Sequence, residues 1–268
     1  MFCIGFTRWG GVKILRTTST KTAAGARKTA LIPGGVRGIG RALALRLAAE
    51  DWAVVACYKN SGCAANSLRK ELKAINAPSW IIRTNVSNPA AAEKLVQDTE
   101  KRFGRIDALI NCVGAYHRAP LLEETVEGWH SMFDTNLHPV FYLCRAASPG
   151  FMRRYGGRII NFSMVNAEQQ AAQPYVTAHY IAKSGVIVLT RSLAKILAPY
   201  GVTANVISPG FIDSGGVPLE ELAQSFKSIP AGYMGSPDDV VSAVRWLLSE
   251  EARYVNGANI QISGAWGV

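Results

Sequence analysis

The chain has 268 residues, and 49% of them are hydrophobic, which is enough to bury one sizeable core in a single domain. No apolar run reaches the roughly 20 residues that a membrane-spanning helix needs, so the sequence predicts no membrane insertion. The five cysteines show no CxxC spacing and do not group with the four histidines. This pattern predicts no metal site, and reduced thiols in an intracellular protein.

The excess of positive charge is unevenly placed. The 29 basic and 19 acidic residues give a net charge of +10, and residues 1–28 carry six basic side chains and no acid. A basic, hydroxyl-rich and acid-free segment is typical of a mitochondrial presequence. We therefore expect residues 1–27 to be a targeting segment and the protein to lie in the mitochondrial matrix, with the cytoplasm as the alternative. A disordered basic tail, or an arm that binds nucleic acid or an acidic partner, are the other interpretations.

The main domain, residues 28–268, opens with a strand, a tight turn and a helix. The apolar run Ala30–Ile32 suits a buried strand, and apolar residues recur at helical spacing after the turn. Between them lie Gly34, Gly38 and Gly40, which let backbone N–H groups approach a phosphate at a helix N-terminus. The spacing Gly-x-x-x-Gly-x-Gly resembles the nucleotide loop of the short-chain dehydrogenase/reductase family, although Pro33 stands where that family commonly has Thr.

The next strand, Ala53–Tyr58, has no acid at its end. An acid there would accept the ribose hydroxyls of NAD and repel the 2′-phosphate of NADP. Instead, Lys59 and Asn60 follow the strand, and Arg37 stands inside the glycine loop. Two cations beside small polar groups suit a phosphate, so the sequence favours NADP(H) over NAD(H).

Helices and strands continue to alternate along the rest of the chain, which predicts a parallel, doubly wound sheet. The expected fold class is α/β, a single-domain Rossmann-like sheet flanked by helices. The expected helices are 64–75, 89–103, 125–152 (bent by Pro139 and ended near Pro149), 172–198 and 237–249, and the expected strands are 80–83, 106–111, 158–163, 203–207 and 259–262.

Further motifs resemble the same family across residues 28–268. Asn85 and Val86 stand where the family usually has Asp-Val beside the adenine. Asn111 and Gly114 match the first and last members of its Asn-Asn-Ala-Gly motif. The resemblance implies cofactor contacts at these four residues, and also at Gly34, Arg37, Gly38, Ile39, Gly40, Lys59, Asn60, Lys183, Pro209 and Gly210.

The catalytic pattern of the family is only half present. The resemblance implies that Asn136 orders a proton-relay water and that Lys183 lowers the pKa of a tyrosine four residues earlier, but His179 occupies that position. Tyr180 is one residue later, about 100° around the helix, and Ser163 similarly precedes the position expected for the catalytic serine. A neutral His179 beside a cation would be a poor proton donor.

Met164 occupies the aligned serine position, and strand alternation would point Ser163 away from the face that Met164 uses. Two interpretations stay open: the segment from Ser163 to Tyr180 refolds so that both face the nicotinamide, or the chemistry has decayed.

Three functions stay open from the resemblance and from the basic charge. The first is an NADP(H)-dependent oxidoreductase, acting as a homotetramer or homodimer on a small carbonyl or a pterin-like ring, with Tyr180 or His179 giving the proton. The second is a catalytically weak or silent relative that serves as a structural subunit of a mitochondrial assembly containing RNA. An NADP(H)-sensing module without turnover is a third. The substrate stays open, because the expected lid, Phe211–Ser228, has no recognisable chemistry.

Overall fold

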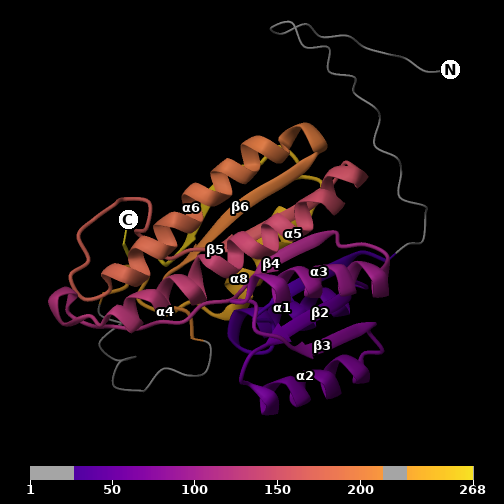
Figure 1. The fold of residues 1–268 in the computed structure, drawn as a ribbon, viewed down its shortest axis with the longest axis horizontal. Coiled ribbons are helices and arrows are strands. Elements are labelled where there is room, and N and C mark those ends of the chain that lie inside the picture. Colours follow the sequence, from indigo (N-terminus) through magenta and orange to yellow (C-terminus); the bar gives the residue numbers. More distant parts are fainter. Residues whose placement is uncertain (1–26, 214–227, 268) are drawn as a thin grey trace, which may run out of the picture.

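The computed structural model describes residues 27–213 and 228–267. They form one parallel sheet of seven strands in the order β3-β2-β1-β4-β5-β6-β7 (Figure 1). The strand order reverses between β1 and β4, and ligands of such sheets bind beyond the strand ends at this switch point. The strands are β1 Thr29–Pro33, β2 Ala53–Tyr58, β3 Ser79–Arg83, β4 Ala108–Asn111, β5 Gly157–Phe162, β6 Val202–Pro209 and β7 Asn259–Ile262.

Helices cover both faces of the sheet. Helices α1, α2 and α8 pack together on one face, and α3, α4, α5 and α6 pack together on the other. The helices are α1 Gly38–Ala49, α2 Gly62–Ala74, α3 Pro89–Phe103, α4 Val126–Asn136, α5 His138–Arg154, α6 Thr177–Leu197 and α8 Pro237–Leu248, with 3₁₀ turns η1 Leu121–Glu123 and η2 Ala198–Tyr200.

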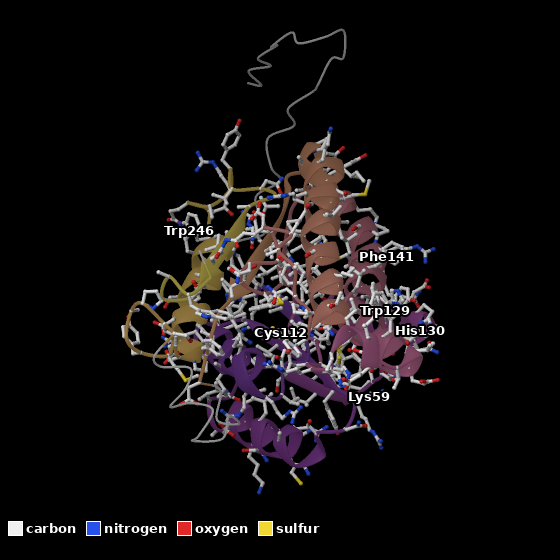
Figure 2. The ribbon with its side chains drawn as sticks, turned by 90° about the vertical axis from the view of Figure 1, so that its left-hand side faces the viewer. Lys59, Cys112, Trp129, His130, Phe141 and Trp246 are labelled. Atoms are coloured by element: carbon white, nitrogen blue, oxygen red, sulfur yellow. The ribbon has the colours of Figure 1, made fainter. Side chains whose placement is uncertain are left out.

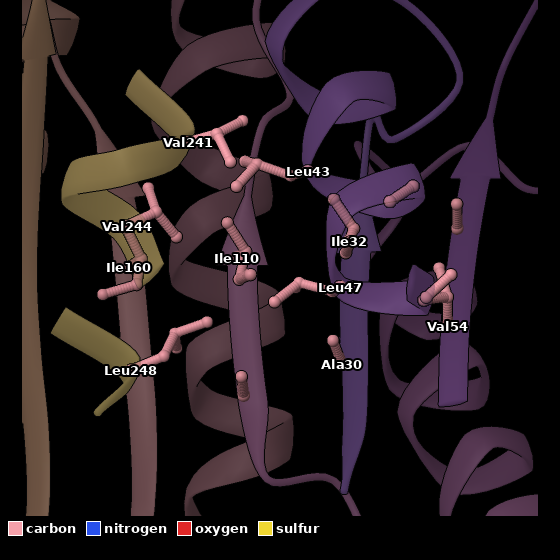
Figure 3. Packing of buried hydrophobic residues seen from close by; sticks show 14 of the residues in the cluster. Ala30, Ile32, Leu43, Leu47, Val54, Ile110, Ile160, Val241, Val244 and Leu248 are labelled. Carbon is pink, nitrogen blue, oxygen red and sulfur yellow. The ribbon is translucent and has the colours of Figure 1, made fainter. Parts of the chain in front are cut away.

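Each face of the sheet has its own apolar core. Figure 3 shows the first, in which Leu43 and Leu47 of α1 meet Val244 of α8 over Ile110 and Ile160 of the sheet. All five side chains are almost fully buried. Strands buried on both faces have continuous apolar sequences, which is why the sequence identified them. The predicted single-domain, doubly wound α/β fold is confirmed.

Two predicted helices differ from the structure. The expected helix 172–198 begins only at Thr177, as α6. The expected helix 125–152 is two helices, α4 and α5, which meet at Leu137, two residues before Pro139. Pro149 lies inside α5, which continues to Arg154, so the prediction that it ends the helix was wrong. A proline removes one hydrogen bond from a helix, and α5 keeps its shape because Ala147 and Phe151 on either side of Pro149 are buried in the second core.

Two predictions lie largely outside the described residues. Of the basic segment 1–27 only Arg27 is described, where it pairs with Asp51. Of the expected lid, Phe211–Ser228, only its two ends are described. Within the described part of the chain, no helix is both long and apolar enough to cross a bilayer.

Candidate functional site

The glycine loop leaves the carboxyl end of β1 and turns into α1. Gly34 has a φ of +78°, and a Cβ there would lie 2.6 Å from the backbone oxygen of Cys112. A Cβ at Gly40 would lie 2.6 Å from the backbone oxygen of Gly34. Both positions therefore require glycine. Pro33 is compatible with this turn because its carbonyl accepts the Cys112 N–H. The N–H of the next residue, Gly34, donates to the backbone carbonyl of Cys57 on β2.

The loop opens onto two adjoining clefts. The larger, of about 620 Å³, runs past the ends of β1, β2 and β3, and the smaller, of about 250 Å³, runs past the ends of β4, β5 and β6. Arg37, Cys112, Val113 and Gly114 line both, so the two form one groove. Figure 2 shows Cys112 near the middle of the molecule, and Lys59 at the far end of the larger cleft is exposed.

Most of the predicted cofactor contacts line this groove. The larger cleft is lined by Gly34, Arg37, Gly38, Lys59, Asn60, Asn85, Val86 and Gly114. The smaller is lined by Ile39, Gly40, Lys183 and Pro209, together with Ser163. Gly210 follows Pro209 and closes the sheet edge by donating its N–H to the carbonyl of Ile262. The combined volume suits a large cofactor, and the turn at the start of α1 suits its pyrophosphate.

The larger cleft is positive. Arg37 and Lys59 are exposed, and neither forms an ion pair within residues 27–213 and 228–267. No Asp or Glu belongs to the lining of this cleft, and none lies in the first turn of α1. The arrangement suits an anionic ligand, as predicted from the sequence.

Asn136 and Lys183 meet beneath Gly114. Asn136 donates from Nδ2 to the carbonyls of Ala115 and Met132, both at 3.0 Å, while its buried Oδ1 has no partner in the described part of the chain. A Cβ on Gly114 would lie 2.8 Å from this Oδ1 and 3.3 Å from Lys183 Nζ. The absence of a side chain at Gly114 thus leaves the amide oxygen and the amine facing the same small space.

Lys183 is buried and donates to the carbonyl of Phe162 at 3.1 Å. Burial lowers its pKa from 10.5 to about 8, against a smaller opposing effect of Cys112. The amine therefore keeps its proton at neutral pH but can exchange it close to that pH.

His179 lies one helical turn before Lys183. It is 7% exposed, and the ring of Tyr116 packs edge-on against it with centroids 5.4 Å apart. Burial, and then the charge of Lys183, lower the pKa of His179 to about 4, although a hydrogen bond with the Ala115 backbone raises it. The imidazole is neutral at physiological pH, and its Nδ1 has no partner among the described residues.

Tyr180 does not join this group. Its hydroxyl donates to the Asn166 carbonyl at 2.5 Å and accepts the Ala171 N–H at 2.9 Å. Its ring packs in a small cluster with Ile187 and Val206, and Tyr180 is not in the lining of either cleft. One residue moves a side chain about 100° around a helix, so Tyr180 faces away from the face of α6 that carries Lys183. The interpretation that Tyr180 turns toward the nicotinamide is corrected.

Ser163 is differently placed from the sequence expectation. It lines the smaller cleft, whereas Met164 packs beside the Tyr180 cluster. The face used by Ser163, and not that of Met164, is therefore the cleft face. However, the Ser163 hydroxyl donates to the Lys183 carbonyl at 2.8 Å, so this hydrogen bond links the end of β5 to α6.

Asn111 also departs from its predicted cofactor role. Its side chain is fully buried and donates to Asn161 at 2.7 Å, which donates in turn to Thr190 at 2.9 Å. Strand alternation turns Asn111 into the second core, so it holds β4, β5 and α6 together and lines neither cleft.

Cys112 and Tyr116 are site residues that sequence reasoning missed. Cys112 lines both clefts, and burial raises its pKa to about 12, so its thiol is protonated. Only its position could have identified it, because the residue after β4 lies at the switch point of the sheet. Tyr116 carries no motif, and its contact with His179 depends on the fold.

The chain is similar to known proteins over most of its length. The family model described as enoyl-(acyl carrier protein) reductase matches residues 34–266. The 3-oxoacyl-[acyl-carrier-protein] reductase FabG of Staphylococcus aureus is 36% identical over 242 residues, covering 88% of this chain and 97% of the relative. FabG of Salmonella typhimurium is 32% identical over 241 residues, covering 88% and 96%.

Two solved structures share the whole fold. A dehydrogenase/reductase from Sinorhizobium meliloti matches with a TM-score of 0.83 and 31% identity, covering 91% of this chain and 96% of the other. A blue fluorescent protein from a metagenomic library, solved with NADPH, matches with a TM-score of 0.83 and 30% identity, covering 90% and 98%. The chain therefore belongs to the short-chain dehydrogenase/reductase family of oxidoreductases.

Proposed function

We propose that the protein is an NADP(H)-dependent oxidoreductase that reduces a small carbonyl compound or a pterin-like ring. The observation that carries this proposal is the single groove that joins the unpaired cations Arg37 and Lys59 to the buried amine of Lys183. The names of the relatives support it, since two are reductases of a 3-oxoacyl group and one neighbour was solved with NADPH. We also propose that it works as a homodimer or homotetramer.

Each part of the groove has a role in this proposal. The N–H groups of the glycine loop bind the pyrophosphate, and Arg37 and Lys59 bind the 2′-phosphate. Asn85 and Val86, at the end of the larger cleft, border the adenine. When bound, the nicotinamide supplies the hydride that passes to the carbonyl carbon.

The carbonyl oxygen must gain a proton as the hydride arrives. Lys183 holds a transferable proton at Nζ, with a pKa near 8, and we propose it as the source. Asn136 Oδ1 orients this amine or a water beside it, and neutral His179 orients the reacting oxygen. Tyr180 takes no part, because its hydroxyl already has two partners.

The test is the rate of NADPH oxidation by the full chain, with 3-oxoacyl thioesters and small carbonyl compounds as substrates. Lys183→Met should lower kcat by about 100-fold or more, because a positioned acid contributes 10² to 10⁴. Lys195→Met, at the exposed far end of α6, is the control and should leave kcat unchanged. Equal rates for wild type and Lys183→Met would overturn the assignment of Lys183.

A second candidate is favoured by the bonded hydroxyl of Tyr180 and the low pKa of His179. In this alternative the protein binds NADP(H) with little or no turnover, as a sensor or as a structural subunit of a mitochondrial assembly that contains RNA. The basic segment 1–27 motivates both this role and the proposed matrix location. Salt-sensitive co-sedimentation with a large particle would support the second candidate, and a lone homo-oligomer in mitochondrial extract would count against it.

A further inference from the structure

A third cation, Arg83, contacts the backbone of Lys59, which lines the larger cleft. Arg83 is the last residue of β3, and the parallel register places it opposite Tyr58 of β2. Its Nε donates to the backbone carbonyl of Lys59 at 3.1 Å. The guanidinium therefore holds the short segment that follows β2, which also carries Asn60.

The terminal nitrogens of the Arg83 guanidinium have no partner in the described structure. Within residues 27–213 and 228–267 its terminal nitrogens form no hydrogen bond, and Arg83 forms no ion pair. Other cations near the same sheet edge are committed: Arg41 pairs with Glu71, and Arg69 donates to Asn66 and to the Ile81 carbonyl.

Arg37 lies in the loop after β1, Lys59 directly follows β2 and Arg83 ends β3, so three cations lie at the carboxyl ends of these strands. An adjoining polar cavity of about 490 Å³ shares Lys59, Asn85, Ser87 and Thr135 with the larger cleft, and Glu127 and Asp134 of α4 belong to its lining. Asp134 hydrogen-bonds His138, and neither acid is within ion-pair distance of Lys59. The positive charge of this corner is therefore left for a ligand.

We infer that Arg83 determines the preference for NADP(H): it positions Lys59 through the backbone and presents its free terminal nitrogens to the ribose 2′-phosphate. This inference rests on the proposed function. A planar guanidinium suits a phosphate because it donates two parallel hydrogen bonds. NADH has no 2′-phosphate, so loss of Arg83 should affect only one of the two dinucleotides.

The experiment compares dissociation constants for NADPH and NADH, measured by nicotinamide fluorescence on the full chain. Arg83→Met should weaken NADPH binding about tenfold, as expected for one charge-assisted contact, and change NADH binding by less than about twofold. Arg83→Lys should restore part of the preference. Arg69→Met, which removes the same charge from neighbouring α2, should leave both constants unchanged.

Different failures have different meanings. Equal weakening of NADPH and NADH binding by Arg83→Met would show that Arg83 only supports the fold. Unchanged affinity for both dinucleotides would likewise overturn the inference. Either outcome would leave the proposed function intact. A wild-type protein that binds neither dinucleotide at millimolar concentration would overturn both.

Discussion

The two ends of the groove are built differently. At the proposed phosphate end, the groove is formed by backbone turns and by exposed cations, Arg37 and Lys59, that have no acid partner in the described chain. At the proposed reaction end, the groups are buried side chains such as Asn136 and Lys183, which donate hydrogen bonds to backbone carbonyls. The backbone shape of the proposed phosphate end depends on Gly34 and Gly40, where a Cβ would clash, whereas a reacting group must keep its place on one helix face. The phosphate end therefore keeps the family pattern where the reaction end departs from it.

The electrostatics differ in the same way. Exposed charges are screened by salt, so ionic strength should control affinity at the phosphate end. At the reaction end, burial lowers the pKa of Lys183 to about 8 and of His179 to about 4. There, pH should control both chemistry and stability.

The largest effect is expected in the glycine loop, from Gly40→Val. Its side chain would meet the Gly34 carbonyl and the Gly35 Cα, since even a Cβ would come within 2.6 and 2.9 Å. We expect NADPH affinity to fall by about 100-fold or more, together with a loss of stability of about 1–3 kcal/mol for overpacking, measured by titration and by denaturant unfolding. Gly62→Ala is the control, because nothing lies within 4 Å of its Cβ position. Unchanged NADPH affinity in Gly40→Val would contradict the pyrophosphate site.

A smaller effect is expected from His179→Gln, seen in the pH dependence of stability. The unfolded imidazole takes up its proton near pH 6.5 but the folded one only near pH 4, so wild type loses stability as pH falls through this window and Gln does not. The difference amounts to about 2 kcal/mol at pH 5 and vanishes above pH 7. Chemical denaturation at pH 7.5 and pH 5 measures it. Parallel loss in both proteins would show that His179 is not held neutral.

The smallest effect is expected from Tyr180→Phe. The carbonyl of Asn166 and the N–H of Ala171 would lose their shared partner, at a cost of about 1–2 kcal/mol in the free energy of unfolding. Turnover should stay within about threefold of wild type, since the hydroxyl lies outside the groove. Tyr200→Phe, in the 3₁₀ turn η2 beyond the opposite end of α6, serves as the control. A loss of kcat of about 100-fold with unchanged stability would restore Tyr180 as the acid and erase the contrast between the two ends.

The sequence predicted what depends on local pattern. Buried strands, the turn at Gly34 and the helix start at Pro237 all follow from short-range rules. The prediction failed where the result depends on which way one side chain turns. Asn111 points into the core because of its place on β4, and Tyr180 turns away because a neighbouring loop supplies its hydrogen bonds.

The contact between Arg83 and Lys59 could not be predicted from the sequence either. It is made to the backbone carbonyl of Lys59, and any residue type has such a carbonyl. The register of β2 against β3 was needed to place the two residues side by side.

The most direct test of the account is a titration of the full chain with NADPH and with NADH, followed by nicotinamide fluorescence and by the Tm. We expect a dissociation constant for NADPH in the micromolar range, about tenfold or more below that for NADH, and a Tm that rises with NADPH by mass action. No binding of either dinucleotide at millimolar concentration would contradict the proposed NADP(H) site.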